Sequence, residues 1–108
     1  MIVTTGNEIS GYTITDYVGI VRGIVVRSPS ITQGILGGLK QIVGGNIESY
    51  AKVCETARQE AYQRMVTHAV EQKADAVIGM RYDATEFSAN VTEVLAYGTA
   101  VKLRREAN

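Results

Sequence analysis

Residues 12–27 read YTITDYVGIVRGIVVR, a run rich in β-branched side chains that predicts one long strand. Successive side chains of a strand point to opposite faces. One face carries Ile14, Asp16, Val18, Ile20, Arg22, Ile24 and Val26, and the other carries Tyr17, Gly19, Val21, Gly23 and Val25. Both faces are mostly apolar from Tyr17 onward. A small antiparallel sheet usually leaves one face in water, so two apolar faces need two coverings. We expect helices of the chain to cover one face and another subunit to cover the other.

Two glycines interrupt this strand. Gly19 and Gly23 are typical of a bend in a long strand or of the close approach of a second backbone. Before them, residues 1–5 read MIVTT and predict a shorter strand, followed by turns around Gly6 and Gly11. The first 27 residues are therefore expected to form two strands.

Length and charge limit the class of protein. The chain has 108 residues, which is a common size for one domain, and we expect residues 1–108 to form a single domain. Eleven basic residues balance eleven acidic ones without clustering, so the sequence indicates neither a nucleic-acid nor a membrane-surface partner. With no signal-peptide pattern and one cysteine, Cys54, the sequence favours a reducing, cytoplasmic location.

The middle of the chain is predicted to be helical. Apolar residues recur at helical spacing over 31–43 and again over 47–72. Between these helices, GGLKQIVGGNIESY at 37–50 resembles a phosphate-binding loop, but the glycine and lysine spacing of such loops is absent. Gly44 and Gly45 are typical of a helix end, and Asn46 is typical of the cap of the next helix. The alternative is an anion bound by the amides after Gly45.

Cys54 and His68 lie on one side of the second predicted helix. Ile47, Tyr50, Cys54, Ala57, Ala61, Met65 and His68 share a narrow arc, with Glu55, Gln59, Gln63 and Val66 opposite. Fourteen residues of helix separate Cys54 from His68 by roughly 21 Å, so one chain cannot bind a single ion through both. We expect a buried Cys54 and a hydrogen-bonded His68. A metal ion would need these residues from several subunits.

The last third of the chain predicts a hairpin. AVIGMRYD at 76–83 and VTEVLAYGTAVKL at 91–103 read as strands, with a polar connection over 84–90 and a frayed tail from Arg104. Arg81 and Asp83 share one face of the first of these strands. They predict either a cross-strand salt bridge or a polar pocket joined by Glu86 or Glu93.

Five stretches together resemble one family. MIVTT, YVGIVRGIVV, the IVGG before a long helix with Tyr50, ADAVIGMRYD and YGTAV follow the order found in the YbjQ-like family, described as "putative heavy-metal-binding". The resemblance covers nearly the whole chain. It implies a small, dodecin-like α+β subunit that assembles into a ring, typically a homopentamer. Together with the residue patterns it predicts an antiparallel sheet of about four strands in the order β-β-α-α-β-β, with two helices on one face.

The function expected on these grounds is binding rather than catalysis, because no nucleophile and base can be paired. One possibility is an oligomer that binds a heavy-metal ion such as zinc or copper, or a small ligand, where subunits meet. The alternative is a structural or protein-interaction ring. The candidate metal ligands are Cys54 and His68, across subunits, and the candidate ligand-binding residues are Gly44, Gly45, Asn46, Tyr50, Arg81 and Asp83.

Overall fold

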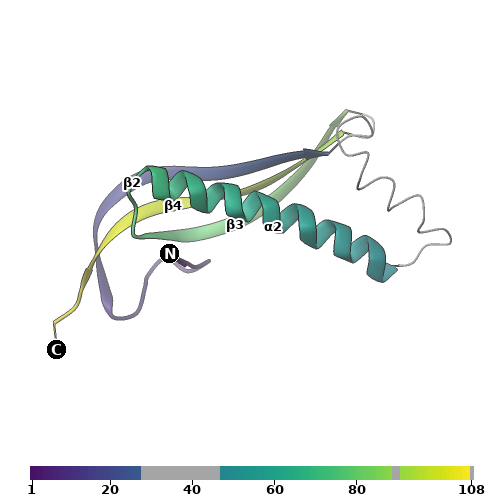
Figure 1. Cartoon of the computed structure of the whole chain (residues 1–108). Helices are drawn as coiled ribbons and strands as arrows, with labels where there is room; N and C mark the ends of the chain where they lie inside the picture. The colour runs from purple at the N-terminus through teal and green to yellow at the C-terminus, as the bar shows by residue number, and fades with distance from the viewer. Residues whose placement is uncertain (28–46, 89–90, 108) are drawn as a thin grey trace.

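A computed structural model describes residues 1–27, 47–88 and 91–107 of the protein. The elements in these ranges are β1 (Ile2–Val3), β2 (Tyr12–Arg27), α2 (Ile47–Glu71), β3 (Ala76–Ser88) and β4 (Val91–Arg105). They form an α+β fold in which α2 lies along one face of the sheet (Figure 1). The predicted bounds of β2 and α2 are confirmed to within one residue. The helix predicted over 31–43 lies outside the described residues.

The sheet is mixed, with the strand order β1-β3-β4-β2. β2 and β3 both run antiparallel to β4, as predicted. β1 instead runs parallel to β3, pairing Ile2 with Ala76 and Val3 with Val77, so the prediction of a wholly antiparallel sheet was wrong. No hairpin links β1 to β3, because β2 and α2 intervene, and the direction of their pairing is therefore free of the hairpin constraint.

Both strands of the final hairpin run further than predicted. Residues 84–88, expected in a polar connection, continue β3 and pair with β4, for example Ala84 with Val94. Arg104 and Arg105, expected in a frayed tail, pair with Thr13 and Tyr12 of β2. Polarity misled both predictions, since a strand whose side chains face water needs only its backbone pairing to continue.

One core lies between α2 and the sheet. Ala57, Ala61, Met65 and Ala69 of α2 are buried at a spacing of four residues, which places them on one side of the helix. Their partners on the sheet are also mostly small: Val21, Val25, Val77, Met80, Ala96 and Ala100. A side chain added at Gly23 would collide with the backbone of α2 at Ala61 and Met65. Gly23 thus permits the close approach predicted for it.

The C-terminus of α2 is closed without a glycine. Lys73 takes a left-handed conformation with φ of 61°. Its N–H donates to the carbonyl of Val70, and the N–H of Ala74 donates to the carbonyl of Ala69. This pair of hydrogen bonds satisfies the last carbonyls of the helix and turns the chain into β3.

The opposite face of the sheet is only partly covered. At one end a second cluster joins Ala76, Ile78 and Val101 to Ile9, Ile14 and Leu103. Register shifts at Ile14/Asp16 and Tyr17/Gly19 change the alternation of β2. Val18 therefore packs with the helix-side core, while Tyr17 pairs with Val101 of the second cluster. The predicted faces are right from Ile20 to Val26 and wrong for Asp16, Tyr17 and Val18, because two strand irregularities precede Ile20.

Candidate functional site

Beyond the second cluster, the side of the sheet opposite α2 exposes several large apolar side chains. Residues paired across strands share a face, so the register identifies the members of this surface. We call it the open face and define it by Tyr17, Ile20, Arg22, Ile24, Tyr97, Arg81, Asp83 and Glu93. Ile20 is 73% exposed and Tyr17 is 71% exposed, while Ile24 and Tyr97 are each 36% exposed. Exposure of this extent on a sheet is typical of an interaction surface.

Tyr97 lies at the centre of the open face. It pairs with Arg22 on one neighbouring strand and with Arg81 on the other. The next row places Leu95 between Ile24 and Asp83. The register thus places two arginines on the strands that flank Tyr97, with an aspartate one row away. The sequence pattern found Arg81 and Asp83 but missed Tyr97 and Arg22, which only the pairing register brings beside them.

Arg81 and Asp83 do not pair with each other among the described residues. The Arg81 guanidinium donates through Nη1 to the carbonyls of Thr5, at 2.9 Å, and Met80, at 2.8 Å. Asp83 Oδ1 accepts a hydrogen bond from the N–H of Ala84 at 2.9 Å. Both residues are exposed. They lie on one surface as predicted, but the salt bridge considered for them is not formed.

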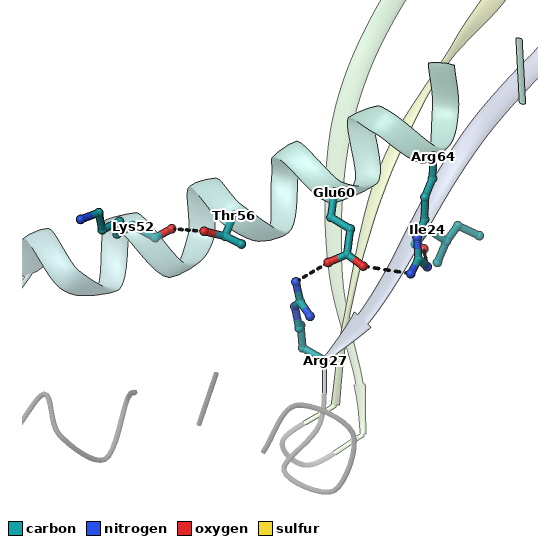
Figure 2. Close-up of polar contacts among 6 residues, drawn as sticks. All are labelled: Ile24, Arg27, Lys52, Thr56, Glu60 and Arg64. Atoms are coloured by element: carbon teal, nitrogen blue, oxygen red, sulfur yellow. Dashed lines mark hydrogen bonds and ion pairs between the residues drawn. The ribbon is translucent and has the colours of Figure 1, made fainter. Parts of the chain in front are cut away.

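Ion pairs around Glu60 hold α2 against the end of β2 (Figure 2). Glu60 lies between two arginines, with Oε2 at 2.9 Å from Arg27 Nη2 and Oε1 at 2.9 Å from Arg64 Nη2. Arg64 also donates through Nη1 to the carbonyl of Ile24 at 2.6 Å. One carboxylate bridges two guanidinium groups, and this arrangement orients the helix on the strand. Sequence reasoning did not identify it.

The two candidate metal ligands differ in their surroundings. Cys54 is exposed on α2, so the prediction that it is buried was wrong: among the α2 side chains that the structure describes, Ala57 is the first buried one. Val66, predicted on the water side, packs against the core instead. His68 is hydrogen-bonded as predicted, with Nδ1 accepting from the N–H of Arg22 at 3.2 Å.

These residues do not make a metal site within one chain. Over the described ranges, no group of three or more His, Cys, Asp or Glu side chains could hold a metal ion. Because Nδ1 of His68 accepts a hydrogen bond, the neutral ring carries its proton on Nε2 and has no free lone pair. His68 therefore does not fit the role of a metal ligand in this conformation.

Three of the remaining candidates cannot be placed. Gly44, Gly45 and Asn46 lie outside the described residues, and with them the hinge and its anion-binding alternative. Tyr50 lies in the first turn of α2, whose side chains are not described.

A hollow at the opposite end of the sheet was not predicted. It has a volume of about 760 Å³ and lies beside the turn that leads into β2. Carboxylates from Glu8 and Glu106 and rings from Tyr12 and Tyr17 line it. It is open and polar, and only Tyr17 connects it with the open face.

One aromatic side chain on the helix side has altered acidity. Partial burial raises the pKa of the Tyr82 phenol, and the nearby Tyr62 and Glu55 raise it further, while Arg58 lowers it. The Arg58 guanidinium carbon lies 5.9 Å from the centre of the Tyr82 ring.

In the part of the chain that the structure describes, no helix is long and apolar enough to cross a membrane.

Comparison with known proteins gives consistent results. Relatives called UPF0145 proteins include one from Legionella pneumophila (strain Corby), 57% identical over 101 residues, which are 94% of this chain and 96% of that protein. Another, from Paraburkholderia phymatum, is 55% identical over 103 residues, or 95% and 93% of the two chains.

A solved structure shares the fold. The crystal structure of a protein of unknown function in the DUF74 family, from Pediococcus pentosaceus, matches with a TM-score of 0.63 over 96% of this chain and 98% of that one. The two sequences are 21% identical. The model of the YbjQ family, described as "putative heavy-metal-binding", matches residues 1–104. The chain therefore belongs to the YbjQ family, as the five stretches of its sequence predicted.

Proposed function

We propose that this protein is a self-assembling binding protein in which the open face of each copy is covered by another copy, in a ring of five. Ligands are held where the copies meet. The observation that carries the proposal is the exposure of Tyr17, Ile20, Ile24 and Tyr97 on one sheet surface. Burying these side chains against a second copy removes apolar area from water, at about 25 cal/mol per Å².

Charge on the open face supports a second copy as the occupant. Arg22 and Arg81 supply two positive charges, and Asp83 and Glu93 supply two negative ones. A ring of five needs a contact in which the open face of one copy meets a different surface of the next, and charges of both signs on the open face can pair with opposite charges on that surface. The whole chain is also neutral, with eleven charges of each sign, so long-range repulsion between copies is small.

Shape supports the same proposal. The radius of gyration is 17.1 Å, and the molecule measures 57 × 24 × 18 Å. A compact domain of about this length has a radius of gyration near 13 Å. The long sheet is visible in Figure 1, where the strands extend as a narrow band. A chain this extended gains much of its buried area only in contact with neighbours.

The ligand is a small molecule or a metal ion, and the two differ in the residues required. The Arg22–Tyr97–Arg81 row offers two guanidinium groups, which suit a carboxylate or phosphate, and an aromatic ring against which the organic part of a ligand can pack. A soft metal such as zinc or copper would instead need thiolates of Cys54 from several copies. No catalytic role and no nucleic-acid partner are part of the proposal, and a single cysteine suits the cytoplasm.

Native mass spectrometry of protein purified without chelator tests both parts, because it reports the number of subunits and any retained ion or ligand. We expect five subunits for the wild type and smaller species for Ile20→Lys. Val70→Lys is the matched control, since Val70 is a similar aliphatic residue, 58% exposed, on α2 and not on the open face. A monomeric wild type, or equal assembly of Ile20→Lys and wild type, contradicts the proposal.

Measurements on the same preparation distinguish a ligand-binding role from a purely structural role. A ring that retains nothing, and gives no heat with zinc, copper or cadmium in titration calorimetry, favours the structural or protein-interaction ring. Metal binding that is lost in Cys54→Ala assigns the site to the thiol. Small-molecule binding that is lost in Arg81→Met, with assembly intact, assigns it to the open face.

A further inference from the structure

β2 is an outer strand of the sheet, and α2 covers part of its outer edge. The unpaired N–H and C=O groups of such an edge can bind another strand, which makes edges a hazard for unwanted association. Two of these groups have side-chain partners on α2. The N–H of Arg22 donates to His68 Nδ1 at 3.2 Å, and the carbonyl of Ile24 accepts from Arg64 Nη1 at 2.6 Å.

The positions of the four residues explain the arrangement. Arg22 and Ile24 are two apart on β2, so their backbone groups point to the same side of the strand. Arg64 and His68 are four apart on α2, so their side chains lie one turn apart on the same side of the helix. Between them, the helix backbone passes directly over Gly23. The close approach at Gly23 lets both side chains reach the strand edge.

The hydrogen bond also fixes the chemistry of His68. Its Nδ1 lone pair is used by Arg22, and Nε2 carries the proton. Binding a metal would require release of the Arg22 N–H. The imidazole of His68 can therefore bind the Arg22 N–H or a metal ion, but not both.

We propose that His68 and Arg64 form an edge clasp that closes the outer edge of β2 to strand addition at Arg22 and Ile24, and that His68 is not a ligand of a heavy metal in this protein. The clasp is a property of one chain and does not depend on the proposed ring. It leaves the open face, and not this edge, as the surface for a second copy.

The test compares His68→Asn with His68→Ala. The Asn carbonyl oxygen is attached to Cγ as Nδ1 is, so it can accept the same hydrogen bond, whereas Ala cannot. We expect the Arg22 amide to exchange its hydrogen at similar rates in wild type and His68→Asn, and about tenfold faster in His68→Ala. The amide of Val21, which faces β4, should be unchanged in all three. An unchanged Arg22 rate in His68→Ala overturns the hydrogen-bonding role.

Metal binding is tested with zinc alone. We expect His68→Asn and the wild type to bind zinc with equal affinity. Absence of zinc binding in both proteins also agrees with the proposal. Loss of zinc binding in His68→Asn, with Arg22 exchange unchanged, overturns the exclusion of His68 as a ligand.

Closure of the edge is tested by removing both side chains. The double variant His68→Ala/Arg64→Ala should form larger species by light scattering than the wild type does. Gln63→Ala, an exposed neighbour on α2, is the control and should match the wild type. A double variant that keeps the wild-type size overturns the part of the proposal that concerns strand addition.

Discussion

The two faces of the sheet are built from alternate residues of the same strands, yet they differ in the size of their side chains. The helix side carries Gly23, Ala96, Gly98 and Ala100, all buried. The open face carries Ile20, Ile24 and Tyr97, which are exposed. The open face also carries Arg22, Arg81, Asp83 and Glu93. Small side chains are what allow α2 to approach the opposite face, because its own contact residues are mainly alanines.

The largest effect is expected from a side chain added where α2 approaches the sheet most closely. Gly23→Val should lower the free energy of unfolding by at least about 4 kcal/mol, because the new side chain overlaps the backbone of Ala61 and Met65, which cannot move without the helix. Valine otherwise favours strands, so the loss measures the collision. Urea denaturation is the measurement. Gly6→Ala, where an added Cβ has only ordinary contacts, is the control, and similar stability of the two variants would contradict the prediction.

A second comparison places one deletion on each face. Met65→Ala should cost about 3 kcal/mol, because Met65 is fully buried between α2 and the sheet. Ile20→Ala should cost less than about 0.5 kcal/mol in dilute solution, since Ile20 is 73% exposed.

Concentration sharpens this comparison. If copies cover the open face, the cost of Ile20→Ala grows with protein concentration, because assembly stabilises the folded state by mass action. The cost of Met65→Ala should stay constant. Thermal unfolding over a hundredfold range of concentration distinguishes the two, and parallel behaviour of the variants would argue against a second copy on the open face.

Periodicity predicted the parts of the fold that repeat, and missed the parts set by pairing. The strand over 12–27 followed from its β-branched side chains and the helix ending near residue 72 from apolar spacing, and the alternation from Ile20 to Val26 correctly separated the two faces. Tyr17 and Val18 were misplaced, because Gly19 signals a bend in the strand but does not reveal which residue is the extra one.

The candidate site shows the same limit. Arg81 and Asp83 were found because charges stand out in an apolar strand, whereas Tyr97 and Arg22 join them only through the register of three strands. Cys54 was expected to be buried because it lies on the apolar arc of α2. Burial on this arc is seen at Ala57, Ala61 and Met65 but not at Cys54, and where the contact with the sheet ends is a tertiary property.

A smaller effect is expected at the polar contact between α2 and β2. Glu60→Gln should cost about 1 kcal/mol, because the Glu60 side chain is 40% exposed and its two ion pairs are of the solvent-accessible kind. The difference from wild type should shrink in 1 M salt, which screens exposed pairs. Unfolding by urea at low and high salt measures it. A loss that is independent of salt would show that hydrogen-bond geometry matters more than charge.

The smallest effect concerns Tyr82, which joins β3 to α2 on the helix side. Its raised pKa means that the folded state favours the neutral phenol, so its contribution to stability is present below the ordinary tyrosine pKa near 10 and is lost as the pH rises through the raised value. Tyr82→Phe cannot ionise and keeps the ring next to Arg58. We therefore expect the variant to match the wild type at neutral pH and to lose less stability than it in alkali. Tyr17, which is 71% exposed on the open face, supplies the matched change Tyr17→Phe. Absorbance titration of the phenols and unfolding measurements above pH 9 test this prediction. The phase of the titration at the highest pH should be lost in Tyr82→Phe and kept in Tyr17→Phe. Its loss in Tyr17→Phe instead would contradict the assignment of the raised pKa to Tyr82.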